Sequence, residues 1–337
     1  MFAIQKLKLS LLFLEAIGIF AFFTIFSNVL MPFFSKTMGF PGIILFWLSY
    51  GLFGAIIAYF VRKLKAGWSW KDLGFKVYKS WRRDIWFGII IFSVFYLIEI
   101  PLTIILIPTQ SQKLVQQMNF LQQMSLPIAF LMLTGLALIL GFITGAFHEE
   151  IRYRGYLQGL FSKEITPAFG FFISLIPFCF NHYFSHPDWN LLQVINTLLP
   201  GISFCLGYYA TGSLIVSMTT HTLTNLIPSY PILLYMKDYK DLSYVSVFLL
   251  GAFFIGLILF GKKEIKYLLQ KSYELFALSG LKSSLLGIVC GIFFLFLYHW
   301  LGSIQSLLNV SKEISILILF VFSLLCISLS MIKINKN

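Results

Sequence analysis

Residues 130–155 read FLMLTGLALILGFITGAFHEEIRYRG, and they decide how the rest of the chain is interpreted. The first sixteen of them carry no charge. A long apolar run of this kind is typical of a membrane-spanning helix. Five ionisable side chains then follow within seven positions: His148, Glu149, Glu150, Arg152 and Arg154. Either they mark the end of the helix at the membrane surface, or they form a charged cluster held inside the membrane for chemistry.

The composition places the whole chain among membrane proteins. Of its 337 residues, 58% are hydrophobic and only 11% are charged, with a mean hydropathy of +0.86. An ordinary soluble domain has about a quarter of its residues charged. The net charge is +12, and the charged residues lie between apolar runs and mostly on one side of the membrane. This distribution indicates topology signals rather than a nucleic-acid partner. We therefore predict an all-α, polytopic transmembrane helix bundle in the lipid bilayer.

We predict about ten membrane spans, each containing about twenty apolar residues. They cover residues 10–33, 41–62, 84–107, 127–160, 166–185, 191–210, 213–236, 243–260, 283–302 and 314–332. If the N-terminus is inside, most Lys and Arg residues lie on the inner side. This predicts a multi-pass protein of the cell membrane with both termini in the cytoplasm. Glu15, near the start of the first span, is expected to extend to the inner membrane face.

The run 127–160 is predicted to form a hairpin with the next span. As one helix it would be about 50 Å long, against a hydrocarbon core of about 30 Å, so it must tilt or protrude. Thr166 and Pro167 close the hairpin. Glu149 and His182 lie at nearly equal distances in sequence from this tip, so both should lie about 25 Å from it. We therefore expect their carboxylate and imidazole groups to face each other.

The spacing within the charged cluster separates the two carboxylates. Glu150 and Arg154 are four residues apart, in the order that favours an ion pair on a helix. Glu149 lies about 100° further round the helix. Four and eight residues before it are Gly145 and Gly141, which would allow another helix to approach closely. This predicts that Glu150 is paired with Arg154 and that Glu149 is available as a base.

Polar pairs also interrupt two later apolar runs, in FCFNHYFSH and SMTTHTLTNL. Amide hydrolysis needs an activated water, an acid for the leaving nitrogen and stabilisation of an oxyanion. A carboxylate and two histidines with an asparagine contain suitable groups for all three tasks. Three motifs stand in order along the chain: Glu149-Glu150-x-x-x-Arg154, Phe178-x-x-x-His182 and His221-x-x-x-Asn225.

This arrangement resembles the CPBP family, which comprises CAAX proteases and bacteriocin-processing enzymes and is also called the Abi family. The resemblance covers residues 141–225, and WSWKDLGF at 68–75 is similar to a stretch often found before the core in this family. It implies an intramembrane endopeptidase in which Glu149 and His182 activate water. It further implies that His221 and Asn225 hold the oxyanion, and that the residues supporting the site are Glu150, Arg154 and Phe178.

The resemblance and the residues together suggest three consecutive parts. Residues 1–125 are expected to form N-terminal transmembrane helices, with a basic, Trp-rich interfacial segment at 63–83. Residues 126–236 would form the catalytic CPBP core of four helices, and residues 237–337 the C-terminal transmembrane helices. The expected partner is a membrane-embedded or membrane-bound peptide or protein substrate. Bacterial members of the family are linked to bacteriocin maturation, and the Phe, Ile and Lys usage favours a bacterial source.

Zinc is the competing expectation for the chemistry. Glu149, His182 and His221 are acceptable Zn²⁺ ligands, and enzymes of the family have been described as metalloproteases. However, the sequence has no HExxH motif, and Asn225 and Arg154 are poor neighbours for a cation. We therefore favour metal-free catalysis without a cofactor.

The residues also allow several other interpretations. The charged cluster could simply mark a cytoplasmic helix end. The chain could be an inactive CPBP-like scaffold or immunity partner. An ion-coupled transporter could use Glu149, His182 and Glu99 as a relay. The role of His148 is undecided, while His186 is expected at the outer boundary and His299 at the membrane interface.

Overall fold

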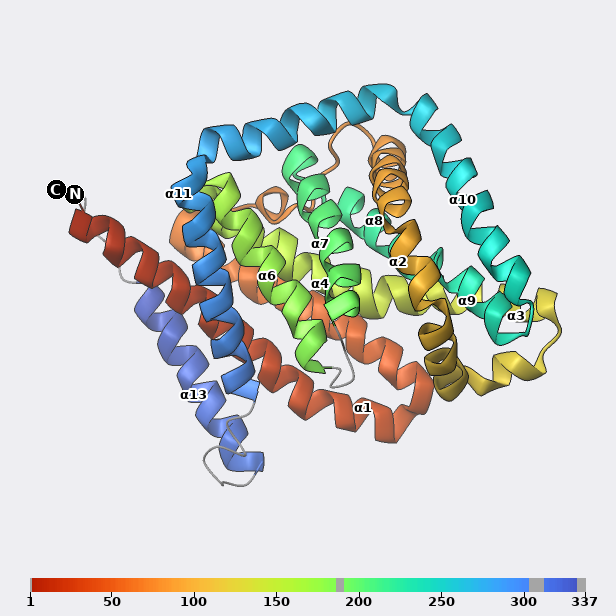
Figure 1. The fold of residues 1–337 in the computed structure, drawn as a ribbon. Coiled ribbons are helices and arrows are strands. Elements are labelled where there is room, and N and C mark those ends of the chain that lie inside the picture. Colours follow the sequence, from red (N-terminus) through yellow and green to blue (C-terminus); the bar gives the residue numbers. More distant parts are fainter. Residues whose placement is uncertain (1, 186–190, 303–311, 332–337) are drawn as a thin grey trace. The chain divides into compact units, whose positions relative to one another are not determined.

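The structure is a computed structural model that describes residues 2–185, 191–302 and 312–331. These residues form helices and connecting turns, with no strand among them (Figure 1), which confirms the all-α prediction. His186 lies outside the described residues, as does the side chain of His299. The chain divides into two compact units that alternate along the sequence. Unit 1 comprises residues 1–75, 151–185 and 279–337, and unit 2 comprises residues 76–150 and 186–278.

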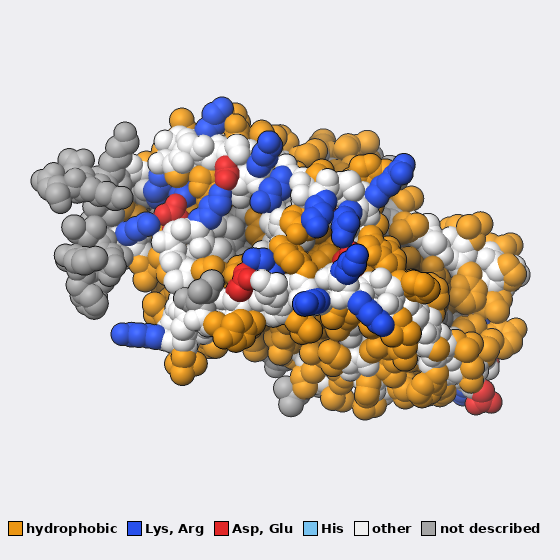
Figure 2. Space-filling model, turned by 90° about the horizontal axis from the view of Figure 1, so that it is seen from above, with side chains coloured by type: hydrophobic (Ala, Val, Ile, Leu, Met, Phe, Trp, Pro, Cys, Tyr) orange, Lys and Arg blue, Asp and Glu red, His pale blue; other side chains and the backbone are white. Residues whose placement is uncertain are grey.

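Six helical stretches among the described residues are long and apolar enough to cross a membrane: Lys8–Ile25, Ile44–Ala66, Trp81–Gln112, Leu126–Glu164, Lys240–Phe260 and Ser279–Phe296. Large hydrophobic side chains are exposed along them, including Phe260, which is 84% exposed. On the face shown in Figure 2, hydrophobic side chains are widely exposed, Lys and Arg are common, and acidic side chains are sparse. The chain is a multi-pass membrane protein, and the expected total of ten spans stays a prediction.

Unit 1 begins with α1 (Phe2–Ala66), which contains two antiparallel spans. The ring centroids of Phe23 and Tyr50 are 5.1 Å apart, whereas residues this far apart in a straight helix would be separated by about 40 Å. The chain therefore reverses between the spans, as Figure 1 shows. α13 (Lys312–Ser330) packs along the first span, where Ser323 donates a hydrogen bond to the carbonyl of Gly18.

The part of the expected helical hairpin that belongs to unit 1 is present. It consists of η3 (Ile151–Gln158), a π-helical segment, followed by α5 (Gly159–Glu164) and α6 (Pro167–Ser185). Phe161 packs on Phe169, with ring centroids 5.4 Å apart, and Tyr153 packs on Phe178, with centroids 5.5 Å apart. These contacts fix the register of the two arms around a turn at the predicted position.

Buried charged side chains connect distant segments of unit 1. Glu15 was expected to extend to the membrane face, but it is fully buried. Its carboxylate accepts hydrogen bonds from Arg62 at 3.1 Å, from Lys65 at 2.9 Å and from the hydroxyl of Tyr156 at 3.3 Å. The prediction was wrong because partners from distant parts of the sequence compensate the charge inside the protein, where an unpaired carboxylate would be costly.

The Trp-rich segment after α1 contains the short helix η1 (Trp70–Leu73) and contacts the hairpin of unit 1. The ring of Trp68 lies within 4.6 Å of the Arg62 guanidinium and 4.5 Å of the Lys163 ammonium. Lys163 also pairs with Asp72. Burial alone would raise the pKa of Asp72, but hydrogen bonds from Lys163 and Ser69 outweigh it and lower this pKa to about 2.

Unit 2 contains the remaining helices. They are α2 (Trp81–Gln123), α3 (Leu126–Leu136), the π-helical η2 (Ala137–Phe147), α4 (His148–Glu150), α7 (Leu191–Thr211), α8 (Leu214–Leu226), α9 (Ser229–Met236) and α10 (Lys240–Phe260). α11 (Lys262–Gly302) begins in unit 2 and is interrupted at Gly280, where φ is 72°. The predicted span 213–236 is therefore two helices, because Pro228 has no N–H with which to continue α8.

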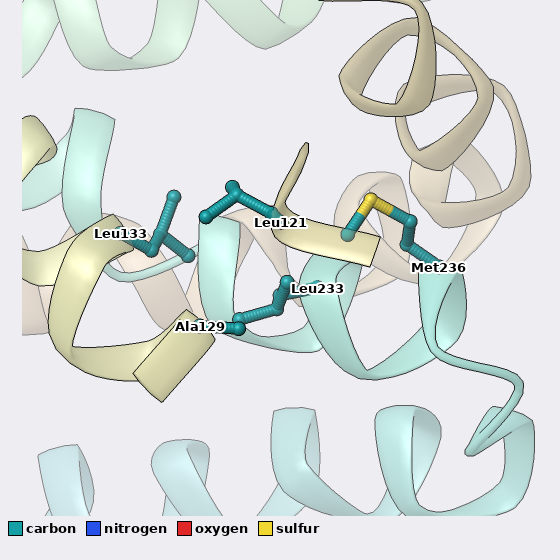
Figure 3. Close-up of a cluster of buried hydrophobic side chains, with 5 residues drawn as sticks. All are labelled: Leu121, Ala129, Leu133, Leu233 and Met236. Atoms are coloured by element: carbon teal, nitrogen blue, oxygen red, sulfur yellow. The ribbon is translucent and has the colours of Figure 1, made fainter. Parts of the chain in front are cut away.

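Two apolar clusters stabilise unit 2. One joins the end of α2 to α3 and α9, and Figure 3 shows its buried side chains: Leu121, Ala129, Leu133, Leu233 and Met236. The other joins α2 to α10 through Phe92, Tyr96 and Phe254. Together they fix the position of α2. The helix α8, which carries two of the predicted site residues, is attached to α2 in turn.

Candidate active site

The helix α8 carries His221 and Asn225 and is attached to α2 at two heights. Asp84 is fully buried and accepts a hydrogen bond at 2.8 Å from the hydroxyl of Ser213, directly before α8. Two turns further along, Thr220 donates to the carbonyl of Gly88 at 3.1 Å. These bonds, both from outside the predicted motifs, fix the position of α8.

His221 is buried and is held on two sides. Its Nδ1 lies 2.8 Å from Oε1 of Glu150, whose side chain is 0% exposed. Its ring stacks on Phe204 of α7, with centroids 4.4 Å apart and planes at 15°. Since a carboxylate accepts, Nδ1 of His221 donates to Glu150, and this bond sets the ring's orientation.

This bond gives Glu150 a partner that the sequence spacing did not predict. The spacing predicted Arg154, which belongs to the other unit, so the pair of Glu150 with Arg154 stays a prediction. His221 lies on a helix far from Glu150 in the sequence, and spacing within one helix contains no information about such a partner. Glu150 also lies between the π-helical segments η2 and η3.

Glu149 has a different environment from its neighbour. Its side chain is 13% exposed, so it is more accessible than that of Glu150. Its Oε2 lies 3.8 Å from Nε2 of His221, and its Oε1 lies 3.9 Å from Nε2 of His148. Both separations exceed a direct hydrogen bond and suit groups that share a water. The undecided His148 is thus buried beside the Glu149 carboxylate.

The predicted glycine stripe faces α8, as expected. A Cβ atom built on Gly145 would lie 3.1 Å from Nδ2 of Asn225 and 3.9 Å from Nε2 of His221. A Cβ atom on Gly141 would lie 3.5 Å from Cβ of Asn225, which is an ordinary contact. Because Gly145 has no side chain, Asn225 and His221, which can both donate hydrogen bonds, closely border the region beside it.

The other three predicted residues gather within unit 1. The guanidinium of Arg154 lies over the ring of Phe178 at 4.1 Å, and this ring packs edge-on against His182 at 4.9 Å. Nδ1 of His182 donates to the carbonyl of Phe178 at 2.9 Å. In a neutral imidazole this leaves the lone pair on Nε2, as a base requires. His182 and Glu149 belong to different units, and their meeting stays a prediction.

The zinc alternative needs at least three protein ligands close together. Glu149 and His221 supply two side chains of the ligand type, and both lie in unit 2. Among the residues that the structure describes, no group of three or more His, Cys, Asp or Glu side chains is arranged to hold a metal ion. Chelation tests the zinc alternative.

A comparison with known families bears on the segment that holds these residues. Residues 130–227 match the family model described as Type II CAAX prenyl endopeptidase Rce1-like. The chain carries a CPBP-family domain. The match includes all three predicted motifs, and at the family level the CPBP domain is that of an intramembrane endopeptidase. No curated protein and no solved structure matches the chain.

Three residues around the CPBP motifs were not predicted. Phe204 stacks on His221, and Asp84 binds Ser213 at the start of α8. Asp84 stands directly after two arginines in SWRRD, a position that suggests only a basic helix end. A buried acid one turn into a membrane span would have been the detectable signal. Glu99, whose role was open, is also buried on α2.

Proposed function

We propose that the chain is an intramembrane endopeptidase that hydrolyses a peptide bond in a membrane-associated peptide or protein. Glu149 and His182 activate the water, and His221 with Asn225 stabilises the oxyanion. The family match supports a membrane endopeptidase in general terms. The observation that carries the specific proposal is His221, held on Nδ1 by buried Glu150 while Nε2 faces Glu149 and the space beside Gly145.

The two carboxylates suit different tasks. Glu149 is partly accessible, and two imidazole nitrogens lie 3.8 and 3.9 Å from its oxygens, so a water can bridge these groups. Glu150 is fully enclosed and already bonded to His221. Glu149 is therefore the base, and Glu150 is a positioning residue that acts through the imidazole.

The space beside Gly145 is the proposed oxyanion site. Nδ2 of Asn225 and Nε2 of His221 both border it. A protonated His221 donates from Nδ1 to Glu150 and from Nε2 to the developing oxyanion. Donors fixed in advance around a developing charge are worth about 10²–10³ in kcat each.

The reaction proceeds in two steps that balance. The water oxygen attacks the peptide carbonyl carbon while its proton moves to Glu149, and the carbonyl oxygen becomes the oxyanion beside Gly145. The C–N bond then breaks, and the leaving amine takes up this proton from Glu149. The other water proton stays on the new carboxylic acid, so the products are a carboxylic acid and an amine, and no oxidant or reductant takes part.

The proposed substrate class is a peptide held at a membrane. The family model is named for endopeptidases of prenylated CAAX proteins, whereas bacteriocin maturation is the role that the resemblance implies for bacterial members. Both substrates are peptides held at a membrane, and cleavage of such a peptide is the activity proposed here. Both termini are proposed to lie in the cytoplasm.

The test is peptide cleavage by the purified full-length protein in liposomes. A library of membrane-inserted peptides is incubated with the wild type, with Glu149→Gln and with Asp241→Asn, an exposed acid of α10, as the matched control. We expect discrete products from the wild type and the control and none from Glu149→Gln. Equal products from Glu149→Gln, or a Glu149-dependent proton flux without any product, would contradict the proposal.

Metal removal tests the mechanism separately. Metal-free catalysis predicts unchanged cleavage after chelator treatment, with no stoichiometric zinc found by metal analysis. Loss of cleavage on chelation, with recovery on adding Zn²⁺, would instead assign zinc to the site and overturn the metal-free mechanism.

A further inference from the structure

A cavity of about 240 Å³ lies in unit 2, away from the CPBP motifs. It opens where α2 begins and where α11 begins. Its basic lining consists of Lys79, Arg83 and Lys263, and its aromatic lining of Tyr78, Phe87 and Tyr267. The proposed peptidase uses none of these residues.

The charge of this pocket favours an anion. Three cations line it against one carboxylate, that of Glu264, which lies 3.2 Å from Arg83 and already pairs with it. The side chains of Lys79 and Lys263 are exposed, so their ammonium groups can reach a ligand. The Tyr267 hydroxyl donates to the carbonyl of Ala210 at 2.8 Å, which fixes the aromatic wall.

The place of the pocket along the chain indicates where its ligand comes from. The candidate span Trp81–Gln112 begins beside it, and the candidate span Lys240–Phe260 ends just before Lys263. The lining residues therefore lie where two spans leave the hydrocarbon core, at the depth of the lipid headgroups. Basic residues at this depth attract anionic lipids.

We infer that this pocket binds the phosphate of an anionic phospholipid headgroup. Lys79, Arg83 and Lys263 pair with the phosphate, and the aromatic side chains pack against the glycerol and the start of the acyl chains. The pocket also adjoins the support of α8, because Asp84 accepts from the backbone N–H groups of Tyr78 and Lys79 as well as from Ser213. A bound headgroup therefore stabilises the segment that holds α8.

The test measures lipid affinity rather than activity. The purified full-length protein in a non-ionic detergent is titrated with dioctanoyl phosphatidylglycerol, dioctanoyl phosphatidylcholine or inorganic phosphate, and binding is followed by the thermal shift. Lys79→Gln/Lys263→Gln removes two pocket charges. Lys266→Gln/Lys282→Gln removes two exposed charges outside the pocket. Lys79→Arg/Lys263→Arg keeps the pocket charge and shows whether substitution itself disturbs the fold.

We expect phosphatidylglycerol to bind the wild type, the outer-lysine control and the arginine variant alike, and the pocket glutamine variant roughly tenfold or more weakly. Equal affinity in the glutamine variant and the wild type would overturn the inference. Equally tight binding of phosphatidylcholine would show that charge does not select the ligand, and this too would overturn it. Equally tight binding of inorganic phosphate would assign a free-phosphate site in place of a lipid site.

Discussion

At the scale of single residues, the proposed chemistry depends on two adjacent carboxylates with different surroundings. Glu150 is enclosed and bonded to His221, while Glu149 is partly accessible beside two imidazoles. The sequence alone predicted that both matter and that Glu149 is the base candidate. It did not predict His221 as a partner of Glu150, because spacing within a helix contains no information about a partner on another helix.

Glu150→Gln tests this division of roles. The amide keeps the shape of the side chain but removes the charge that orients and stabilises a protonated His221. We expect kcat to fall by roughly 10²–10⁴, as for the loss of charge behind a catalytic histidine, while KM changes little. Steady-state cleavage of the peptide found in the library assay gives both constants.

The control for that substitution is Asp241→Asn, which removes an exposed acid outside the site. A wild-type kcat in Glu150→Gln would show that the buried pair does not support catalysis. A rise in KM with unchanged kcat would assign the pair to substrate binding instead.

At the scale of helices, the candidate site forms where α8 approaches η2 closely. Sequence spacing correctly predicted that Gly145 and Gly141 would admit another helix. It did not predict the π-helical segments on either side of α4, because the spacing rules assume α-helical geometry. π-Helical turns are frequent at functional sites, and here they flank both glutamates.

Gly145→Ala tests the proposed oxyanion space. The new methyl group would lie 3.1 Å from Nδ2 of Asn225, so it would fill the space and displace one donor. We expect kcat to fall about tenfold or more. Thermal unfolding should change little, because alanine favours a helix more than glycine does.

Gly141→Ala is the matched control, since its methyl group would make an ordinary contact with Asn225 at 3.5 Å. It should cleave nearly as well as the wild type. Equal kcat values for the two alanine variants would place the oxyanion elsewhere.

At the scale of the whole molecule, the chain forms two compact units whose segments alternate along the sequence. Hydropathy predicted the membrane class and the all-helical fold, because apolar runs and their lengths are local properties of the sequence. The partners of Glu15 depend instead on contacts between distant segments, such as that with Arg62, so they could not be predicted. The division into parts at 1–125, 126–236 and 237–337 stays a prediction.

The central proposal is that Glu149 and His182 act on the same water. Single-turnover cleavage by the wild type, Glu149→Gln, His182→Ala and the double variant tests it most directly. Residues that act as one unit give strongly non-additive losses. The account predicts that each single variant loses roughly 10³-fold or more in rate and that the double variant is no slower than the slower single one. A His182→Ala rate equal to that of the wild type, or losses that multiply in the double variant, would contradict it.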